Sequence, residues 1–237
     1  MRLSLFFALL SLSCAGEDEP GDPMGTMGAS EDVADDDGDG FTNAEEEELG
    51  TDPNSRYSRP YTGGYNVGVC DELPAATGPT GTGENANGVQ WAAYQEGDVA
   101  ENWTMVDQHG EEVDLYSFCG KHVMLAVSAG WCGPCRSLAG EMQAMQDQYR
   151  DQDVQIIEVI TDNNAYEQPD GNFVSQWANQ YGFEDIPVLI LPEPTSWNDL
   201  EFHWEVDTYI PSLWHIGPDG TILSADAGIH DPGVFLN

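Results

Sequence analysis

The chain has 237 residues, 40% of them hydrophobic, and it carries 43 acidic side chains against six basic ones, a net charge of −37 at pH 7. The length suits one domain with accessory segments, and the apolar content is enough for a packed core, which excludes a wholly disordered chain. The charge argues against nucleic acid or an anionic membrane surface as a partner, because binding to either needs clustered Lys and Arg.

The N-terminus has the features of an export signal, which we assign to residues 1–14. One Arg precedes a short apolar run, Leu3 to Leu12, and small residues follow. The run is too short to cross a bilayer as a mature helix. Residues 10–14 resemble a bacterial lipobox, which predicts a lipid anchor on Cys14, although Ser11 stands where that motif usually has Leu. The alternative is ordinary cleavage after Ala15, and both alternatives predict an extracytoplasmic, cell-envelope location.

Residues 15–60 are rich in Gly, Asp, Glu and Pro and predict an acidic low-complexity tether, because they cannot bury enough apolar surface to fold alone. Within it, residues 35–46 have the spacing of a twelve-residue calcium loop, with Gly40 at the turn position. The oxygen ligands would come from Asp35, Asp37, Asp39, the carbonyl of Phe41, Asn43 and Glu46. The following residues 49–53 resemble the end of thrombospondin type 3 calcium repeats. The alternative to calcium is a solvated acidic linker.

Residues 61–94 predict a loop-rich linker, with a run of turn-forming residues at 77–83. From residue 95 to 237 the pattern predicts one domain of short strands and helices. Strands are expected at 102–106, 112–115, 123–128, 154–160, 186–191, 212–216 and 221–225, and helices after Cys135 and at 173–181. A β-α-β start followed by a β-hairpin implies an α/β fold, with a mixed central sheet flanked by helices.

The cysteines divide into two kinds. With Cys14 assigned to a lipid, Cys70, Cys119, Cys132 and Cys135 remain. Because an exported protein can keep a structural disulfide, we predict a Cys70–Cys119 bond, the alternative being two unpaired thiols. Cys132 and Cys135 lie instead where a buried strand meets a helix. Backbone N–H groups at a helix start favour a thiolate, so Cys132 is the expected nucleophile, and Cys135, one turn away, is the resolving thiol.

The run Trp131-Cys132-Gly133-Pro134-Cys135 resembles the motif of thioredoxins, and residues 97–110 and 120–125 resemble the lead-in of the TlpA-type and redoxin subgroup. The resemblance covers residues 95–228. It implies a thioredoxin-like fold and an extracytoplasmic thiol-disulfide oxidoreductase that needs no catalytic cofactor. It also implies disulfide-containing protein substrates and a membrane or periplasmic thiol as electron donor. The Gly-Pro pair between the cysteines favours a reductase.

The same resemblance implies two substrate-binding features and leaves one gap. Ile210 and Pro211 match the loop whose cis-proline faces the active site, and Trp131 is expected to shape the surface beside the disulfide. Thioredoxins bury an Asp at the place of Ala126, and many TlpA-type proteins have a Glu at the place of Leu138. Glu141 is one turn further along and is an alternative acceptor, so the proton route for Cys135 is unassigned.

Three alternatives to the redox enzyme remain open. A zinc site of four thiolates is disfavoured, because only one closely spaced cysteine pair exists. A copper chaperone on the same scaffold would use thiols and imidazoles, and His203, His215 and His230 are available. A calcium-dependent surface protein could use the scaffold only for binding.

Overall fold

The computed structural model describes residues 34–84, 88, 90–190, 204, 209–225 and 230–236. The predicted export signal, its Cys14 and the first part of the predicted tether lie outside these residues, as does His203. Within the part of the chain that is described, no helix is both long and apolar enough to cross a membrane.

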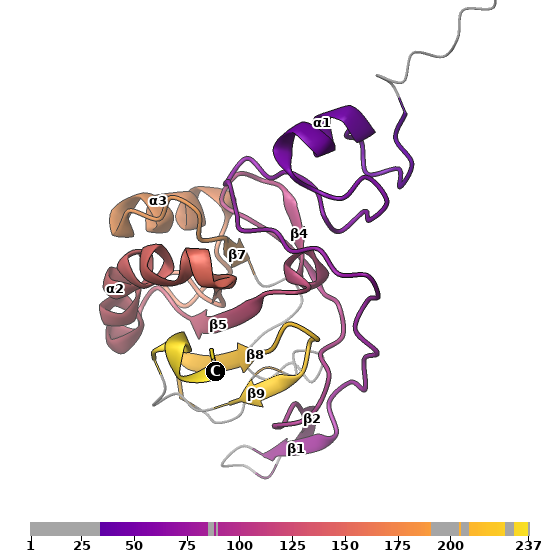
Figure 1. Ribbon diagram of the computed structural model, residues 1–237. Coiled ribbons are helices and arrows are strands. Elements are labelled where there is room, and N and C mark those ends of the chain that lie inside the picture. Colours follow the sequence, from indigo (N-terminus) through magenta and orange to yellow (C-terminus); the bar gives the residue numbers. More distant parts are fainter. Residues whose placement is uncertain are drawn as a thin grey trace, which may run out of the picture. The chain divides into compact units, whose positions relative to one another are not determined.

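A seven-stranded mixed sheet, in the order β4-β3-β7-β6-β5-β8-β9, forms the framework of the domain (Figure 1). The strands are β3 (Thr104–Val106), β4 (Glu112–Asp114), β5 (His122–Ser128), β6 (Val154–Ile160), β7 (Val188–Ile190), β8 (Ser212–Ile216) and β9 (Ile222–Ser224). The three strands β5, β6 and β7 pair in parallel, and the others join antiparallel. The predicted α/β fold with a mixed sheet is therefore confirmed.

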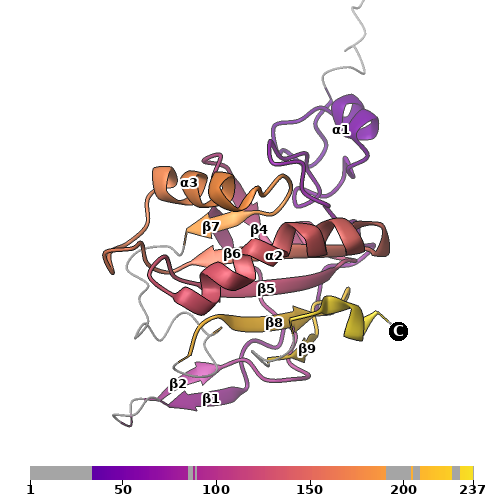
Figure 2. The same ribbon diagram turned by 90° about the vertical axis from the view of Figure 1, so that its left-hand side faces the viewer.

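Two helices, α2 (Gly133–Tyr149) and α3 (Gly171–Tyr181), cover one face of this sheet (Figure 2). The predicted apolar stripe of α2 is buried at Leu138 and Met142, and α3 buries Val174 and Trp177. These side chains pack in one cluster with alternate residues of β5 and β6. Both strands are nearly continuous apolar runs, because both faces of a parallel sheet are covered.

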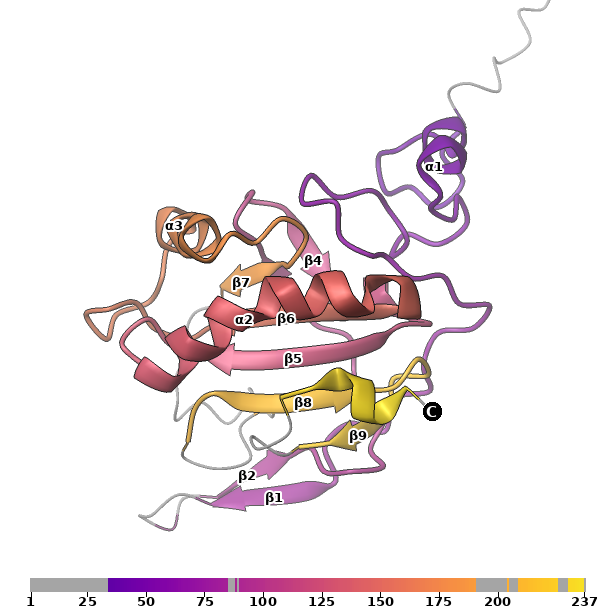
Figure 3. The ribbon, with the colours of Figure 1, turned by 60° about the vertical axis from the view of Figure 1, so that its left-hand side comes forward.

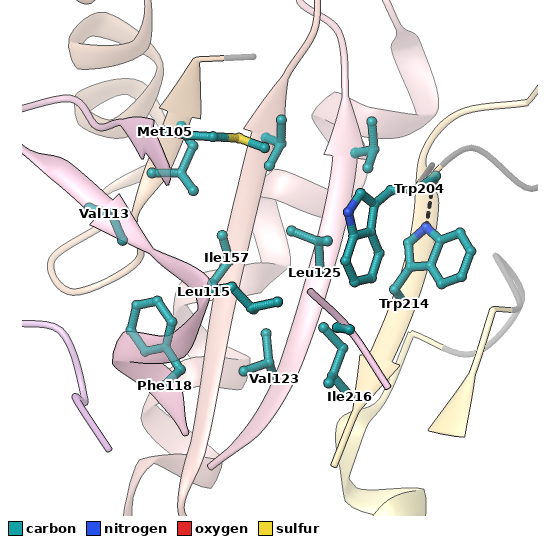
Figure 4. Close-up of a cluster of buried hydrophobic side chains, with 14 of the residues drawn as sticks. Met105, Val113, Leu115, Phe118, Val123, Leu125, Ile157, Trp204, Trp214 and Ile216 are labelled. Atoms are coloured by element: carbon teal, nitrogen blue, oxygen red, sulfur yellow. Dashed lines mark hydrogen bonds between the residues drawn. The ribbon is translucent and has the colours of Figure 1, made fainter. Parts of the chain in front are cut away.

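The opposite face holds a second apolar cluster (Figure 4). Leu125 and Ile157 point into it from β5 and β6, and Phe118 enters from the short 3₁₀ helix η2 (Leu115–Phe118). Trp214 of β8 donates from Nε1 to the carbonyl of Trp204 at 2.6 Å. Two more 3₁₀ turns, η3 (Arg150–Gln152) and η4 (Pro232–Phe235), follow α2 and the sheet.

Residues 61–80 contain neither helix nor strand, in keeping with the predicted loop-rich segment, but residues 61–94 as a whole are not only loop. They contain an antiparallel hairpin, β1 (Gly81–Glu84) and β2 (Gln90–Ala93). Tyr61 and Tyr65 are buried in the core, and the Tyr65 hydroxyl donates to the Asp107 carboxylate at 2.6 Å. The sequence did not indicate this anchoring, because the two aromatic side chains contact the core singly, without the periodicity of a helix or strand.

The described part of the predicted tether is folded as well. A short helix, α1 (Asn43–Leu49), begins with a capping box in which Thr42 and Glu45 accept each other's backbone N–H groups. It ends at Gly50, whose φ of +82° suits a residue without a Cβ. Local capping thus supplies the structure that an acidic composition did not predict.

Candidate active site

Cys132 and Cys135 lie at the start of α2, directly after the turn that follows β5. Cys132 is the N-cap residue, with φ −77° and ψ 114°, and Pro134 stands in the first turn, where its missing N–H leaves no bond unmade. The Cys132 Sγ accepts from the backbone N–H of Cys135 at 3.1 Å. The two residues form a disulfide with Cα atoms 5.3 Å apart. The N-cap position places the first sulfur among the unpaired N–H groups that stabilise a thiolate.

The loop before β8 faces the first sulfur. The Ile210–Pro211 peptide bond is cis, and the Ile210 carbonyl oxygen lies 3.7 Å from the Cys132 Sγ. Ile210 packs against Cys132, Cys135 and Ala129. A groove lined in part by Pro134, Tyr209 and Ile210 runs beside this contact. The residues expected to bind substrate are therefore brought together with the cysteines.

Trp131 and Tyr166 form an aromatic surface beside the disulfide. Their rings stack with centroids 5.0 Å apart and planes 22° from parallel. Tyr166 is 70% exposed and has φ +62°, and its loop is held by the Asn163 Oδ1, which accepts from Ala165 N at 2.7 Å. The sequence analysis placed Trp131 here and missed Tyr166. The available signal was a lone aromatic residue in the polar loop after β6.

The two positions at which thioredoxins and many TlpA-type proteins carry an acid hold apolar side chains in this structure. Ala126 and Leu138 are both buried, and Glu141 is exposed on α2, where it lines the same groove. A buried acid exists elsewhere on the helix-covered face: Glu158 of β6, which is fully buried. Sequence reasoning did not single it out.

Cys70 and Cys119 are joined in a second disulfide, with Cα atoms 5.7 Å apart. The four cysteines are thus used in two separate bonds, and in the described part of the chain no cluster of Cys and His side chains has metal-ligand spacing. His215 packs on Phe235, with ring centroids 4.6 Å apart, and His230 lines the groove. Among the described residues the four thiols therefore do not gather into a zinc site, and the copper alternative also involves His203, which lies outside them.

The residues of the predicted calcium loop converge. Asp35, Asp37 and Asp39 each offer a carboxylate oxygen within 4.8 Å of the others, and Glu46 is fully buried. Three buried oxygens, Asp37 Oδ2, Asp39 Oδ2 and Glu46 Oε2, have no hydrogen-bond partner among the described residues. Burial, with Asp39 and Asp37 adding to it, raises the pKa of Glu46 to about 7. Unpaired hard oxygens in this number suit a cation such as Ca²⁺.

Asn43 makes two hydrogen bonds within that loop. Its Oδ1 accepts from the backbone N–H of Asp36 at 3.0 Å, and its Nδ2 donates to the Asp36 carboxylate at 2.9 Å. The side chain therefore bridges the start and the end of the loop, and its part as a calcium ligand stays a prediction.

Comparisons with known proteins give two family matches. The AhpC/TSA family matches residues 97–225, and the bacterial TSP3 repeat matches residues 35–55. Thiol-disulfide oxidoreductase ResA from Bacillus thuringiensis (strain Al Hakam) is 30% identical over 96 residues, 40% of this chain and 51% of that protein. Thioredoxin 1 from Synechococcus elongatus is 36% identical over 69 residues, 29% of this chain and 54% of that protein. The chain thus spans about half the length of these curated relatives.

Among solved structures, the thioredoxin domain of a thiol-disulfide oxidoreductase from Bacteroides vulgatus superposes with a TM-score of 0.50 at 20% identity. The match covers 61% of this chain and 100% of that domain. This likeness concerns the fold, which is thioredoxin-like.

Proposed function

The chain belongs to the AhpC/TSA family, and from this premise we propose that it is an extracytoplasmic thiol-disulfide reductase acting through Cys132 and Cys135. The observation that carries the proposal is the Cys132 sulfur at the start of α2, bonded to Cys135 and facing the Ile210 carbonyl. The named thiol-disulfide oxidoreductases among the relatives support the reaction class.

The reaction follows from this geometry in two exchanges. In the reduced protein the Cys132 thiolate attacks a substrate disulfide, the bond between the substrate sulfurs breaks, and one of them leaves as a thiolate. Cys135 then attacks the Cys132 Sγ, which releases the second substrate sulfur and closes the Cys132–Cys135 disulfide. The substrate gains two electrons and the protein loses two. A thiol donor in the membrane or the periplasm restores the dithiol.

The substrates in this proposal are proteins with an accessible disulfide. The loop ending at Pro211 presents the Ile210 backbone beside Cys132, where an extended segment can pair with it as an added strand. Trp131 and Tyr166 supply an apolar surface on which side chains flanking the substrate cysteine can rest.

The extracytoplasmic location and the lipid anchor rest on the N-terminal sequence. The apolar run at 3–12 and the lipobox-like residues before Cys14 support export and lipidation. Metabolic labelling with a radioactive fatty acid tests the anchor: label should enter the wild-type chain and be absent from Cys14→Ser. Label retained in that variant contradicts lipidation at Cys14.

An insulin-reduction assay on the full chain tests the activity. We expect turnover with a dithiol donor, loss of turnover in Cys132→Ser, and retained turnover in the paired variant Cys70→Ser/Cys119→Ser. Turnover that survives Cys132→Ser overturns the proposal. Stoichiometric copper binding without turnover would favour the copper chaperone, and absence of both would favour a binding scaffold.

A second proposed function is calcium binding by the loop at 35–46. It is supported by the unpaired oxygens of Asp37, Asp39 and Glu46 and by the match to the bacterial TSP3 repeat. We expect dissociation constants on the order of 10⁻⁴–10⁻³ M, as in other extracellular modules. Calorimetric titration should show Ca²⁺ heat in the wild type and none in Asp37→Asn/Asp39→Asn. The exposed pair Glu47→Gln/Glu48→Gln serves as the charge-matched control.

A further inference from the structure

When Cys135 attacks the mixed disulfide, its thiol has to release a proton, and the proton acceptor has not been assigned. Cys135 is fully buried, so its thiol cannot pass a proton directly to bulk water. Two positions near the cysteines, at which the resemblance to thioredoxins and TlpA-type proteins leads one to expect an acid, hold Ala126 and Leu138. If the reaction runs as proposed above, some other buried group has to take the proton when Cys135 attacks.

Glu158 stands beside the vacated position. In the parallel register of β5 and β6, Ala126 is paired with Glu158. On β6 the neighbours Ile156 and Ile160 belong to the helix-side cluster, whereas Ile157 and Val159 belong to the cluster on the other face. Glu158 alternates with the former pair, so its side chain projects toward the helices. That face is crossed by α2, the helix that begins with the active-site cysteines (Figure 3).

The surroundings of Glu158 bring its pKa close to neutral pH, so that it can both take up and release a proton. Its Oε2 accepts from the Trp177 Nε1 at 2.7 Å, and its Oε1 has no hydrogen-bond partner among the described residues. Burial raises the pKa of Glu158 to about 7, against the lowering effects of the Trp177 indole and the Ser128 hydroxyl. A buried carboxyl with so few donors and no cation beside it is unfavourable as a purely structural element, since a Gln or an apolar residue would avoid the desolvation.

The residues around this carboxyl, taken element by element, include few titratable groups. Ser128 is the next residue of the same face of β5, toward the active-site turn, and β7 contributes Val188. On α3, burial raises the pKa of the Tyr181 phenol, and the charge of Glu158 adds to this effect. From α2, Arg136 acts on Tyr181 rather than on Glu158. The cause of the raised pKa is therefore burial, and no cation offsets it among the described residues.

We propose that Glu158 takes up the proton of Cys135 during resolution of the mixed disulfide, replacing from β6 the acid that β5 lacks at Ala126. The Cys135 S–H bond breaks, the proton goes to the Glu158 carboxylate, and the sulfur's electron pair forms the bond to the Cys132 Sγ. The Cys132–substrate bond breaks and the substrate sulfur leaves as a thiolate. When the disulfide is reduced again, the proton returns to Cys135. This inference rests on the proposed reductase function.

A two-step thiol reagent separates the steps. Reduced protein attacks 5,5′-dithiobis(2-nitrobenzoate) with Cys132 and releases one coloured thiolate, and Cys135 then displaces the second. The measurement uses full-length chain with Cys14, Cys70 and Cys119 changed to Ser, its folding checked by thermal unfolding. We expect Glu158→Gln to leave the first release unchanged and to slow the second by about 10²-fold, a typical general-base effect. Gln keeps an acceptor for the Trp177 indole.

Two outcomes overturn the inference while leaving the reductase proposal intact. One is a second release in Glu158→Gln within twofold of its parent. The other is an equal slowing in Glu141→Gln, which would move the role to the exposed acid of α2. The exposed Glu184→Gln is the matched control for loss of a carboxylate. Absence of the first release in the parent chain would instead contradict the proposed function itself.

A second variant keeps the test decisive if Glu158→Gln does not fold. Trp177→Phe removes the hydrogen bond that stabilises the ionised carboxyl, so the pKa of Glu158 should rise. The inflection in the pH profile of the second release should then shift to higher pH. A merely structural effect would slow the release without moving the inflection, and an unmoved inflection overturns the inference.

Discussion

At the scale of single residues, the buried acids of this domain differ in the hydrogen-bond donors and cations around their carboxylates. Asp107 accepts from the Tyr65 hydroxyl at 2.6 Å and from the backbone N–H groups of His109 and Glu111 at 2.8 and 2.9 Å. Asp185 forms an ion pair with Arg150. Glu158 accepts from the Trp177 indole at 2.7 Å, and the Ser128 hydroxyl also favours its ionised form. Asp107 and Asp185 thus have several donors or a cation beside them, whereas burial raises the pKa of Glu158, as it does that of Glu46 in the loop at 35–46.

The stability of the protein should therefore depend on pH through Glu158. The pKa of this carboxyl rises from 4.5 in the unfolded chain to about 7 in the folded protein, so below pH 4.5 it does not lower the free energy of unfolding. As the pH rises from there through 7 the folded state loses stability, in the end by about 3 kcal/mol. Urea unfolding should find Glu158→Gln more stable than wild type at about pH 8 and close to it at about pH 5. Parallel pH profiles for the two proteins would contradict this, and Glu184→Gln is the control.

Tyr166 and Glu158 also mark where single-sequence reasoning stops. Glu158 looks like an ordinary polar break in the strand Val154–Ile160, and its meaning depends on which residue of another strand lies beside it. Tyr166 meets Trp131 only because the loop after β6 comes back over the active-site turn. Both features come from pairings between distant segments, which no local pattern contains.

At the scale of elements, the segment before the hairpin β1–β2 is held to the domain by covalent and polar links. The Cys70–Cys119 disulfide spans 49 positions. Nearby, Asn66 N donates to the Gln155 Oε1 and Gly68 N donates to the Ser117 carbonyl, both at 2.8 Å. The hydrogen bonds should keep the segment in place without the disulfide, but at a lower overall stability.

We expect Cys70→Ser/Cys119→Ser to lower the free energy of unfolding by about 4 kcal/mol, the chain-entropy value for a closed loop of this length. The second disulfide lies outside this loop, so reduction of insulin at Cys132 should persist below the unfolding transition. Urea unfolding and the insulin assay check the two parts, with the exposed Glu184→Gln as the control for a substitution outside both disulfides. An unchanged stability would mean that the unfolded chain gains nothing from the opened loop.

The regular elements were predictable where hydrophobicity and turn signals agree. The apolar runs of β5 and β6, the stripe of α2 and the turn between β8 and β9 each carry their own local pattern. The active-site cysteines and the loop at Pro211 followed from a motif. The hairpin β1–β2 did not, because Gly81 and Gly83 lack the β-branched side chains that indicate strands.

At the scale of the whole molecule, the main feature is the large excess of negative over positive charge. Against 43 acids the six basic residues form few pairs, and those described include Lys121 with Asp153 at 2.6 Å and Arg150 with Asp185. Most carboxylates therefore repel one another through solvent. Such repulsion is long-ranged and is screened by salt.

Salt should accordingly stabilise the protein. Raising NaCl from about 0.01 M to about 0.5 M shortens the screening length severalfold, and the melting temperature should rise, by about 2–4 °C for each kcal/mol gained. The experiment is done with a calcium chelator present, so that cation binding at residues 35–46 does not contribute. A neutral osmolyte at equal osmolality is the control, and a melting temperature indifferent to salt would contradict the expectation.

If the protein works as the proposed reductase, its electron donor has to reduce one of the two disulfides and leave the other intact. Cys70 is partly exposed, while Cys132 is only 3% exposed, so simple shielding does not protect the bridge at Cys70. A small thiol would reduce both disulfides. It would thus generate the active dithiol at Cys132 and Cys135 but also destabilise the domain by opening the Cys70–Cys119 bond. A protein donor that docks on the backbone at Ile210 reaches one sulfur only, and the choice between priming and damage then rests with the shape of the donor.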